Sequence, residues 1–271
     1  MADTLPKRVL FVGNSFTFYW NLPQSVISMA KSQKINLAAQ QSTGSSATLG
    51  EHWNGDKELQ TLDVLRAGDF DAVVLQEHGM RSIQDPDSTV RHAKLLAEEI
   101  KRKKAKIYIF LPWAREYNPY WQKQLNSQHK ALASDIAGAE LVPVGLAWQR
   151  ARELRPLIPI YDADQIHPSP LGTYLTACVF YGALTKKSPV GLPHRLTYED
   201  SHGQKIYLNL QSEGDALFCQ HVAEEILQTP SAIGAPGAPG STASPTATTS
   251  LSQQTSPVHT AQVANTKGFA A

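Results

Sequence analysis

Three short runs of uninterrupted apolar residues limit most strongly what this chain can fold into. They read Val-Leu-Phe-Val from residue 9, Ala-Val-Val-Leu from residue 72 and Ile-Tyr-Ile-Phe from residue 107. A strand with one face in water alternates apolar and polar residues, whereas a strand buried on both faces is apolar throughout. Strands of the second kind are typical of parallel sheets with helices on both sides. We therefore expect strands over 8–12, 35–40, 72–76, 106–111 and 141–144.

The segments between and after these strands carry helical patterns. Helices are expected over 22–33, 57–67, 87–103, 120–136, 145–154, 170–185 and 213–227. Ser169 before Pro170, and Ser212 three residues before Asp215, are typical N-caps for the last two. Alternating strands and helices imply right-handed crossovers, and so an α/β fold: a three-layer α/β/α sandwich around a five-stranded, mostly parallel sheet. Segments 195–198 and 205–210 predict a peripheral β-hairpin.

The composition divides the chain into a folded part and a tail. Hydrophobic residues make up 42% of the 271 residues, which is ample for a sizeable core. From Thr229 onward the chain consists mainly of Pro, Ala, Gly, Ser, Thr and Gln, and such a segment buries too little apolar area to offset its ordering entropy. We therefore expect one domain over 1–228 and a disordered tail over 229–271.

Charge and cysteine content argue against several classes of function. Lys and Arg number 25 against 24 Asp and Glu, so no basic surface for nucleic acid is indicated, and the basic run 101–104 is interpreted as the solvated end of a helix. Two cysteines are too few for a disulfide framework or a thiolate metal site. No run approaches the roughly 20 apolar residues of a membrane span, and no signal peptide is recognisable. The default expectation is a soluble, cytoplasmic protein.

Two segments could supply a serine nucleophile and its base. Ser15 follows Gly13 at the end of the first strand, where it either caps the next segment or presents a hydroxyl above the sheet edge. A serine hydroxyl needs a base to become a nucleophile. His167 lies in a loop bounded by prolines, and Asp164, three residues earlier, has a spacing suited to orienting its ring. Asp162 is a competing acid.

Polar residues also follow the third apolar run. The amide of Gln76 could donate a hydrogen bond to a developing oxyanion, or it could cap a neighbouring loop. Glu77 and His78 are possible metal ligands by type. Since no further His or acid stands at a spacing that would complete such a site, no metal is expected.

In combination, these segments resemble the blocks of the SGNH/GDSL hydrolase superfamily, which has a flavodoxin-like α/β/α fold. The resemblance covers roughly residues 7–185, with the helix at 213–227 as the last element. It implies that Ser15 is the nucleophile, that His167 is the general base and acid, and that Asp164 orients His167. Asp162 breaks the spacing of the family. The implied reaction is hydrolysis of an ester through an acyl-enzyme, and it needs no cofactor.

The family's oxyanion hole implies three donors here: the backbone N–H of Ser15, the N–H of Gly44 and the side-chain amide of Gln76. Ser45 or Ser46 could replace Gly44, because a backbone donor does not require a particular side chain. The third block departs from the family, since Leu-Gln-Glu-His stands where Gly-x-Asn-Asp is usual. Asn14 replaces the acid of Gly-Asp-Ser and is expected to hold the loop.

Further residues near these blocks are candidates for substrate binding, with simple packing or pairing as the alternative. His52 and Trp53 could form a pocket wall or pack between elements. Arg115 could contact a polar or anionic substrate group, or it could pair with Glu116 or another acid. The candidate substrate-binding residues are Asn14, His52, Trp53, Glu77, Trp113 and Arg115.

The sequence therefore predicts a serine esterase acting on a small-molecule ester, for example an acyl or acetyl group on a carbohydrate, without nucleic acid or membrane partners. It does not predict an oligomeric state. The alternatives are a catalytically silent protein of this fold that binds a sugar or another ligand, and a module that binds phosphate at the Gly13 loop. That loop has a single glycine and no Lys, unlike a phosphate cradle.

Overall fold

The computed structural model describes residues 5–229, and in this part of the chain five strands form one sheet. All neighbouring strands are parallel, in the order β2-β1-β3-β4-β5. This is the flavodoxin-like order of a doubly wound fold, in which ligands bind beyond the carboxyl ends of the strands. The predicted sheet is confirmed. The strands are β1 (Arg8–Gly13), β2 (Ala38–Thr43), β3 (Ala72–Leu75), β4 (Lys106–Phe110) and β5 (Ala139–Val142).

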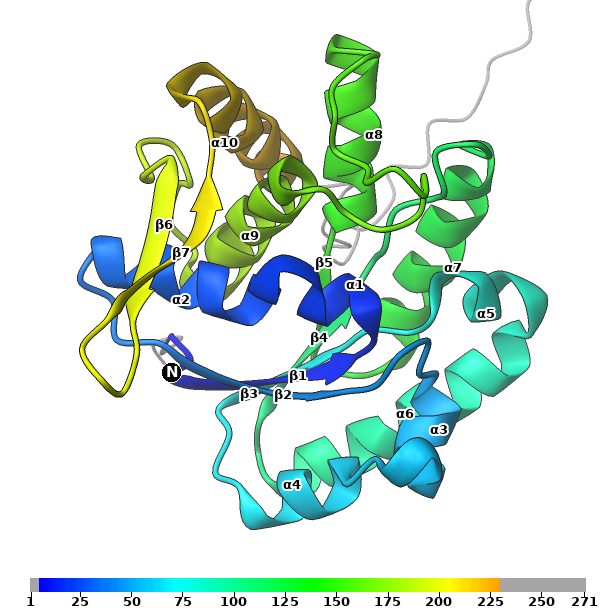
Figure 1. Cartoon of the computed structure of the whole chain (residues 1–271). Helices are drawn as coiled ribbons and strands as arrows, with labels where there is room; N and C mark the ends of the chain where they lie inside the picture. The colour runs from blue at the N-terminus through cyan, green and yellow to red at the C-terminus, as the bar shows by residue number, and fades with distance from the viewer. Residues whose placement is uncertain (1–4, 230–271) are drawn as a thin grey trace, which may run out of the picture. The chain divides into compact units, whose positions relative to one another are not determined.

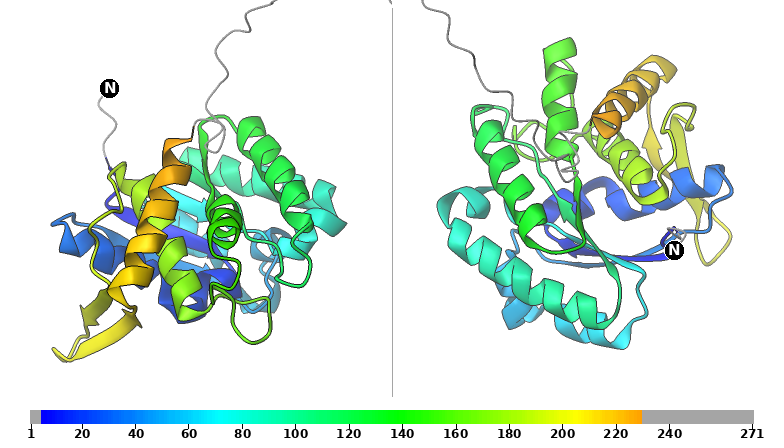
Figure 2. Two further views of the ribbon diagram at one scale, coloured as in Figure 1. Left: turned by 90° about the horizontal axis from the view of Figure 1, so that it is seen from above. Right: turned by 180° about the vertical axis from the view of Figure 1, so that it is seen from behind.

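Helices cover both faces of the sheet (Figures 1 and 2). Successive side chains of β1 enter opposite cores: Val9 and Phe11 lie in one apolar cluster, and Leu10 and Val12 lie in the other. The apolar runs are uninterrupted because both faces are buried. One face carries α2 (Leu22–Ser32), α8 (Val144–Leu154), α9 (Pro170–Thr185) and α10 (Glu213–Gln228); the other carries α4 (Thr61–Ala67), α6 (Pro86–Arg102) and α7 (Trp121–Asp135).

The predicted positions of three elements are wrong by two residues or more: β2, β5 and α4. β5, predicted over 141–144, spans Ala139–Val142, and Val144 already begins α8. β2 begins at Ala38 rather than at 35, and because it is an edge strand with no fully buried residue, no apolar run marks its limits. The helix expected from 57 begins at Thr61, since Lys57 has a φ of 53° inside a separate short turn. Three short helices were not predicted, and each follows a strand: α1 (Ser15–Phe18), α3 (Leu49–Asn54) and α5 (Gly79–Gln84).

The caps and the hairpin agree with the prediction. Ser169 Oγ accepts a hydrogen bond from Gly172 N, and Ser212 Oγ accepts one from Asp215 N. Strands β6 (Arg195–Glu199) and β7 (Lys205–Leu210) pair antiparallel, beside α2. Except for Thr229, the predicted tail lies outside the described residues.

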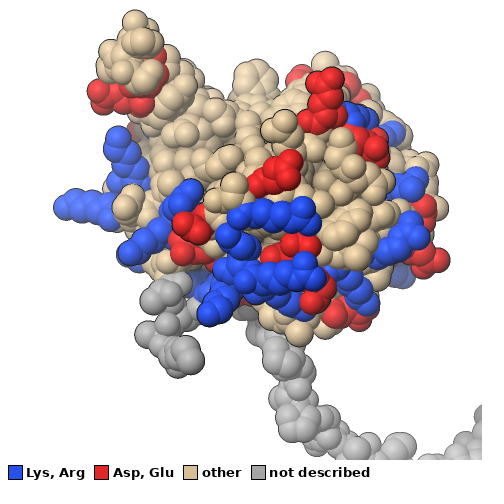
Figure 3. All heavy atoms as spheres, turned by 90° about the horizontal axis from the view of Figure 1, so that it is seen from below, with Lys and Arg blue, Asp and Glu red and all other residues tan. Residues whose placement is uncertain are grey.

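Basic and acidic side chains are interspersed on the face that carries α4 and α6 (Figure 3). Lys101 pairs with Glu98, and Arg102 pairs with Glu99 at 2.7 Å. The run 101–104 thus forms the charged C-terminal end of α6, as predicted. Among the described residues, no helix is long and apolar enough to cross a membrane.

Candidate active site

The loops that follow β1, β3 and β4 meet the loop before α9 at the carboxyl edge of the sheet (Figure 1). A cavity of about 150 Å³ opens there. Its lining includes Ser15 and His167, which are 152 residues apart in the chain. The fold thus brings the segment that contains Ser15 and the loop that contains His167 together.

The end of β1 fixes the position of Ser15. A Cβ on Gly13 would lie 2.4 Å from Gln76 Oε1, so this close approach requires glycine. Asn14 caps α1: its Oδ1 accepts from Phe16 N, and its Nδ2 donates to Ala47 O at 2.9 Å. Asn14 therefore holds the loop, in agreement with its expected role, and Ser15 becomes the first residue of α1, 9% exposed.

His167 connects Ser15 to Asp164. Its Nε2 lies 2.9 Å from Ser15 Oγ, and its Nδ1 lies 2.5 Å from Asp164 Oδ2. The other oxygen of Asp164 accepts from the backbone N–H groups of Ile166 and His167, at 2.9 Å each. Because a carboxylate only accepts, Nδ1 donates to it, and the lone pair of Nε2 is left to accept the proton of Ser15.

The carboxylate of Asp164 is stabilised in its charged form. Burial acts to raise the pKa of Asp164, but hydrogen bonds from the His167 ring and from two backbone N–H groups outweigh it and hold that pKa below its usual range. The competing acid, Asp162, instead accepts from Ala163 N at 2.7 Å. The spacing of three residues, rather than five, therefore places the acid against the ring.

Aromatic side chains hold the imidazole from two sides. Tyr19 stacks on His167 with ring centroids 4.2 Å apart, and Phe16 meets it edge-on at 5.9 Å. Phe16 stacks in turn on Trp113, whose Nε1 donates to the carbonyl of Ile166 at 3.0 Å. Sequence reasoning missed Tyr19, because nothing in the pattern of residues 16–20 shows which ring reaches a loop 148 residues away.

Gln76 does not occupy the position expected of an oxyanion donor. It is fully buried and does not line the cavity. Its Oε1 accepts from Asn14 N at 2.8 Å and from the Thr17 hydroxyl, and its Nε2 donates to Glu77 O at 2.7 Å. This corrects the expected donor role: the amide ties the loop after β1 to the end of β3, which was the capping alternative.

The turn after β2 bears on which backbone N–H, that of Gly44 or that of Ser46, is available as an oxyanion donor. The N–H of Gly44 donates to Gly13 O at 3.3 Å, so it is already engaged. Ser46, with a φ of 50°, lines the cavity. Within this turn Ala47 N donates to Gly44 O, which leaves the N–H of Ser46 outside the turn's own hydrogen bond. The backbone N–H of Ser15, in the first turn of α1, has no partner within its helix either.

Three of the expected substrate-binding residues lie away from the cavity. His52 is fully buried: its Nε2 donates to Gly13 O at 2.9 Å, and its Nδ1 accepts from the Thr61 hydroxyl at 2.6 Å. Burial lowers the pKa of His52, which keeps the ring neutral for these bonds. Trp53 packs against the apolar cluster beneath α4 and α6. The packing alternative is therefore the right one for both residues.

Glu77 is the third expected substrate-binding residue that lies away from the cavity, and its buried carboxyl group holds neighbouring segments together. It is 3% exposed and accepts hydrogen bonds from Leu49 N (3.2 Å), His78 N (2.6 Å) and the Thr89 hydroxyl (3.2 Å). Burial raises the pKa of Glu77 to about 7 in spite of these donors. It joins α3, the end of β3 and α6 behind the cavity.

The other three expected residues, Asn14, Trp113 and Arg115, do line the cavity. The alternative pair of Arg115 with Glu116 is absent: Arg115 donates to the Tyr117 hydroxyl at 2.5 Å, while Glu116 pairs with Arg152 at 3.6 Å. No feature of the sequence pattern places His78 at the cavity, but His78 is one of the residues that line it.

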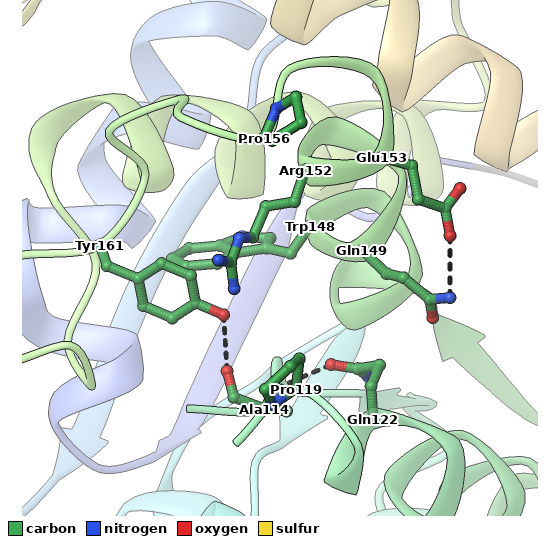
Figure 4. A pocket seen from close by; sticks show the side chains of 9 residues that line it. All are labelled: Ala114, Pro119, Gln122, Trp148, Gln149, Arg152, Glu153, Pro156 and Tyr161. Carbon is green, nitrogen blue, oxygen red and sulfur yellow. Dashed lines mark hydrogen bonds between the residues drawn. The ribbon is translucent and has the colours of Figure 1, made fainter. Parts of the chain in front are cut away.

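A larger cavity, of about 290 Å³, adjoins the same strand end (Figure 4). Its walls include Trp148, Tyr161 and Arg152, and it shares Ala114 with the first cavity. The Tyr161 hydroxyl donates to Ala114 O at 2.6 Å, and Gln122 Oε1 accepts from Ala114 N. This cavity contains no serine beside a base, so the pair of Ser15 and His167 identifies the smaller cavity as the candidate active site. Within 5–229, no three metal-binding side chains gather into a cluster.

No family model matches the chain, and no curated protein matches its sequence. Several solved structures share its fold. A candidate SGNH hydrolase from Slackia heliotrinireducens is 23% identical, with a TM-score of 0.55 over 64% of this chain and 96% of its own. A DUF4886 family protein from Bacteroides uniformis is 16% identical, with a TM-score of 0.64 over 83% and 95%. The acetyl xylan esterase AlAXEase is 14% identical, with a TM-score of 0.54 over 65% and 99%. The chain has the α/β/α fold of the SGNH hydrolases.

Proposed function

We propose that this protein is a serine esterase that hydrolyses a small ester through an acyl-enzyme on Ser15. One observation supports the proposal above the others: His167 lies within hydrogen-bond distance of Ser15 Oγ and of the Asp164 carboxylate at once. A nucleophile, a base and a group that orients the base are the three parts of a serine hydrolase site.

Each residue then has a defined task. His167 Nε2 takes the proton of Ser15 as its Oγ attacks the ester carbonyl, and then gives that proton to the leaving alcohol. In the second half-reaction the same nitrogen activates water, which releases the acid and restores the Ser15 hydroxyl. Asp164 holds the ring and stabilises its charged form. The backbone N–H groups of Ser15 and Ser46 are the proposed oxyanion donors; loss of one such donor typically costs about 100- to 1000-fold in rate.

The size of the cavity supports a short acyl group. A volume of about 150 Å³ suits a short acyl group such as acetyl or butyryl. Its walls are partly apolar, with Phe16, Met80 and Trp113 beside the serine. The similar structures include a protein described as an acetyl xylan esterase. This likeness makes an acetyl group on a carbohydrate a reasonable first substrate to test.

A second candidate function is a catalytically silent protein that binds a sugar or another ligand. The occupied amide of Gln76 favours it, because the oxyanion would then have backbone donors alone. The phosphate-binding alternative has less support. At the Gly13 loop the N–H of Asn14 is bonded to Gln76, and the N–H of Phe16 is bonded to Asn14.

Hydrolysis of 4-nitrophenyl acetate, butyrate and octanoate separates these functions. We expect kcat/KM to fall from acetate to octanoate in the wild type, and activity to disappear in Ser15→Ala and His167→Ala. His202→Ala, on the exposed turn between β6 and β7, is the matched control and should retain full activity. Wild-type activity in Ser15→Ala would refute the esterase, and hydrolysis of no ester by the wild type would favour the silent protein.

A further inference from the structure

Arg115 brings a positive charge to the candidate active site without a carboxylate beside it. It follows β4 and lines the cavity together with Ser15 and His167. The adjacent acid, Glu116, is directed to Arg152 instead. Among residues 5–229, no ion pair includes Arg115, and its polar contact is the hydroxyl of Tyr117.

The guanidinium of Arg115 contacts the exposed side chain of Tyr117. The Arg115 Nη1 donates to the hydroxyl at 2.5 Å, and the guanidinium carbon lies 5.9 Å from the centre of the Tyr117 ring. A tyrosine hydroxyl neutralises no charge. Since a guanidinium has five N–H donors in a rigid plane, one bond to Tyr117 leaves most of them available to a ligand.

The other basic side chains near the cavity are paired with acids. Lys57 pairs with Glu51 at 3.0 Å, and Arg81 pairs with Asp85 at 2.9 Å. Among the described residues that line the cavity, Arg115 is the one Lys, Arg, Asp or Glu. It therefore supplies the formal charge of the lining.

The positive charge of Arg115 also affects the pKa of His78, which lines the same cavity. Burial lowers the pKa of His78 first, and Arg115 is the charged group that lowers it most, followed by Lys57. Glu51 acts in the opposite direction but does not cancel them. The ring is thus neutral near pH 7 and can serve as a hydrogen-bond partner beside the guanidinium.

We propose that the site selects esters that carry a carboxylate close to the scissile bond, and that Arg115 is the residue that recognises this carboxylate. The inference rests on the proposed esterase function and adds the class of substrate to it. A guanidinium binds a carboxylate through two parallel N–H···O bonds, which lysine cannot reproduce. The carboxylate can belong to the acyl part or to the alcohol part of the ester, and the two positions are distinguished by experiment.

Two matched pairs of esters test the inference on the full chain. In the first pair the charge is on the acyl part: 4-nitrophenyl hydrogen succinate against 4-nitrophenyl butyrate. In the second it is on the alcohol part: 4-acetoxybenzoate against its methyl ester. We expect the wild type to prefer the charged member of at least one pair, and Arg115→Gln to reduce that ratio of kcat/KM values on the order of tenfold.

Two further variants separate recognition from a general loss of structure. Arg115→Lys keeps the charge but loses the planar fork, so it should restore only part of the ratio. Arg91→Gln, at an exposed position of α6, should leave the ratio within about twofold of the wild type. High salt should lower the wild-type ratio, because it screens a partly exposed charge.

The outcomes separate a failure of this inference from a failure of the proposed esterase function. Equal kcat/KM values for both members of both pairs, or a preference that Arg115→Gln leaves intact, would overturn the role of Arg115 while leaving the esterase standing. If the wild type hydrolysed none of the four esters, the proposed function and the inference would both fail.

Discussion

The buried carboxyl group of Glu77 should make the stability of this protein depend on pH between about 5 and 8. Glu77 is 3% exposed, and burial raises its pKa from 4.5 to about 7. An acid with a raised pKa is destabilising when it is charged: this cost is absent below the unfolded pKa and is complete above the folded one. A shift of about 2.5 units corresponds to about 3 kcal/mol, and about 2.5 kcal/mol of it falls between pH 5 and pH 8.

Urea unfolding of the wild type and of Glu77→Gln at pH 5 and pH 8 measures this effect. The glutamine does not titrate, so any loss of packing or hydrogen bonding that it causes is the same at both pH values. We expect the free energy of unfolding of Glu77→Gln, minus that of the wild type, to be about 2.5 kcal/mol larger at pH 8 than at pH 5. Glu98→Gln, an exposed residue paired with Lys101, is the control and should show no such change. A difference between wild type and Glu77→Gln that is the same at both pH values would refute the reasoning.

Three further variants test the surroundings of the candidate site. Asp164→Asn should lower kcat by about 100- to 10,000-fold with little change in KM, because the ring of His167 loses its orienting carboxylate; an unchanged kcat in steady-state assays would argue against this role. Tyr19→Ala should lower kcat on the order of tenfold with thermal stability nearly unchanged, since it removes the ring stacked on His167; a lower melting temperature with normal kcat in the surviving protein would contradict it. His52→Leu should cost about 1–3 kcal/mol in urea unfolding, because the carbonyl of Gly13 and the hydroxyl of Thr61 each lose a buried hydrogen-bond partner. If a substitution of His52 changed KM but not stability, His52 would instead contact the substrate.

The fold was predictable where burial leaves a pattern in the sequence. Strands β1, β3 and β4 are buried on both faces, so each appears as an apolar run. The edge strand β2 lacks such a run, and its start was misplaced. The short helices after β1, β2 and β3 have four to six residues, too few to show a helical period.

The candidate site was predictable where a residue's chemistry and its place in a loop decide its position. Ser15 at a strand end and the spacing of Asp164 and His167 carried the resemblance to the SGNH/GDSL blocks, and that resemblance implied that the three side chains meet, as they do in the structure. Gln76 was misjudged because an amide can donate to a ligand or hold a loop with the same atoms, and only the position of Asn14 N decides between them. Similarly, an aromatic or histidine residue near a site gives no sign in the sequence of whether it faces the cavity or the core.

Covalent labelling of Ser15 by a fluorophosphonate is the most direct test of its role as the nucleophile. The probe forms a bond to a serine oxygen only where a base removes the proton, so labelling depends on the contact between Ser15 and His167. We predict one adduct per chain in the wild type, located on the peptide that contains Ser15 by mass spectrometry, and none in Ser15→Ala or His167→Ala. Absence of an adduct in the folded wild type, or equal labelling of Ser15→Ala, would contradict the assignment of Ser15 as the nucleophile.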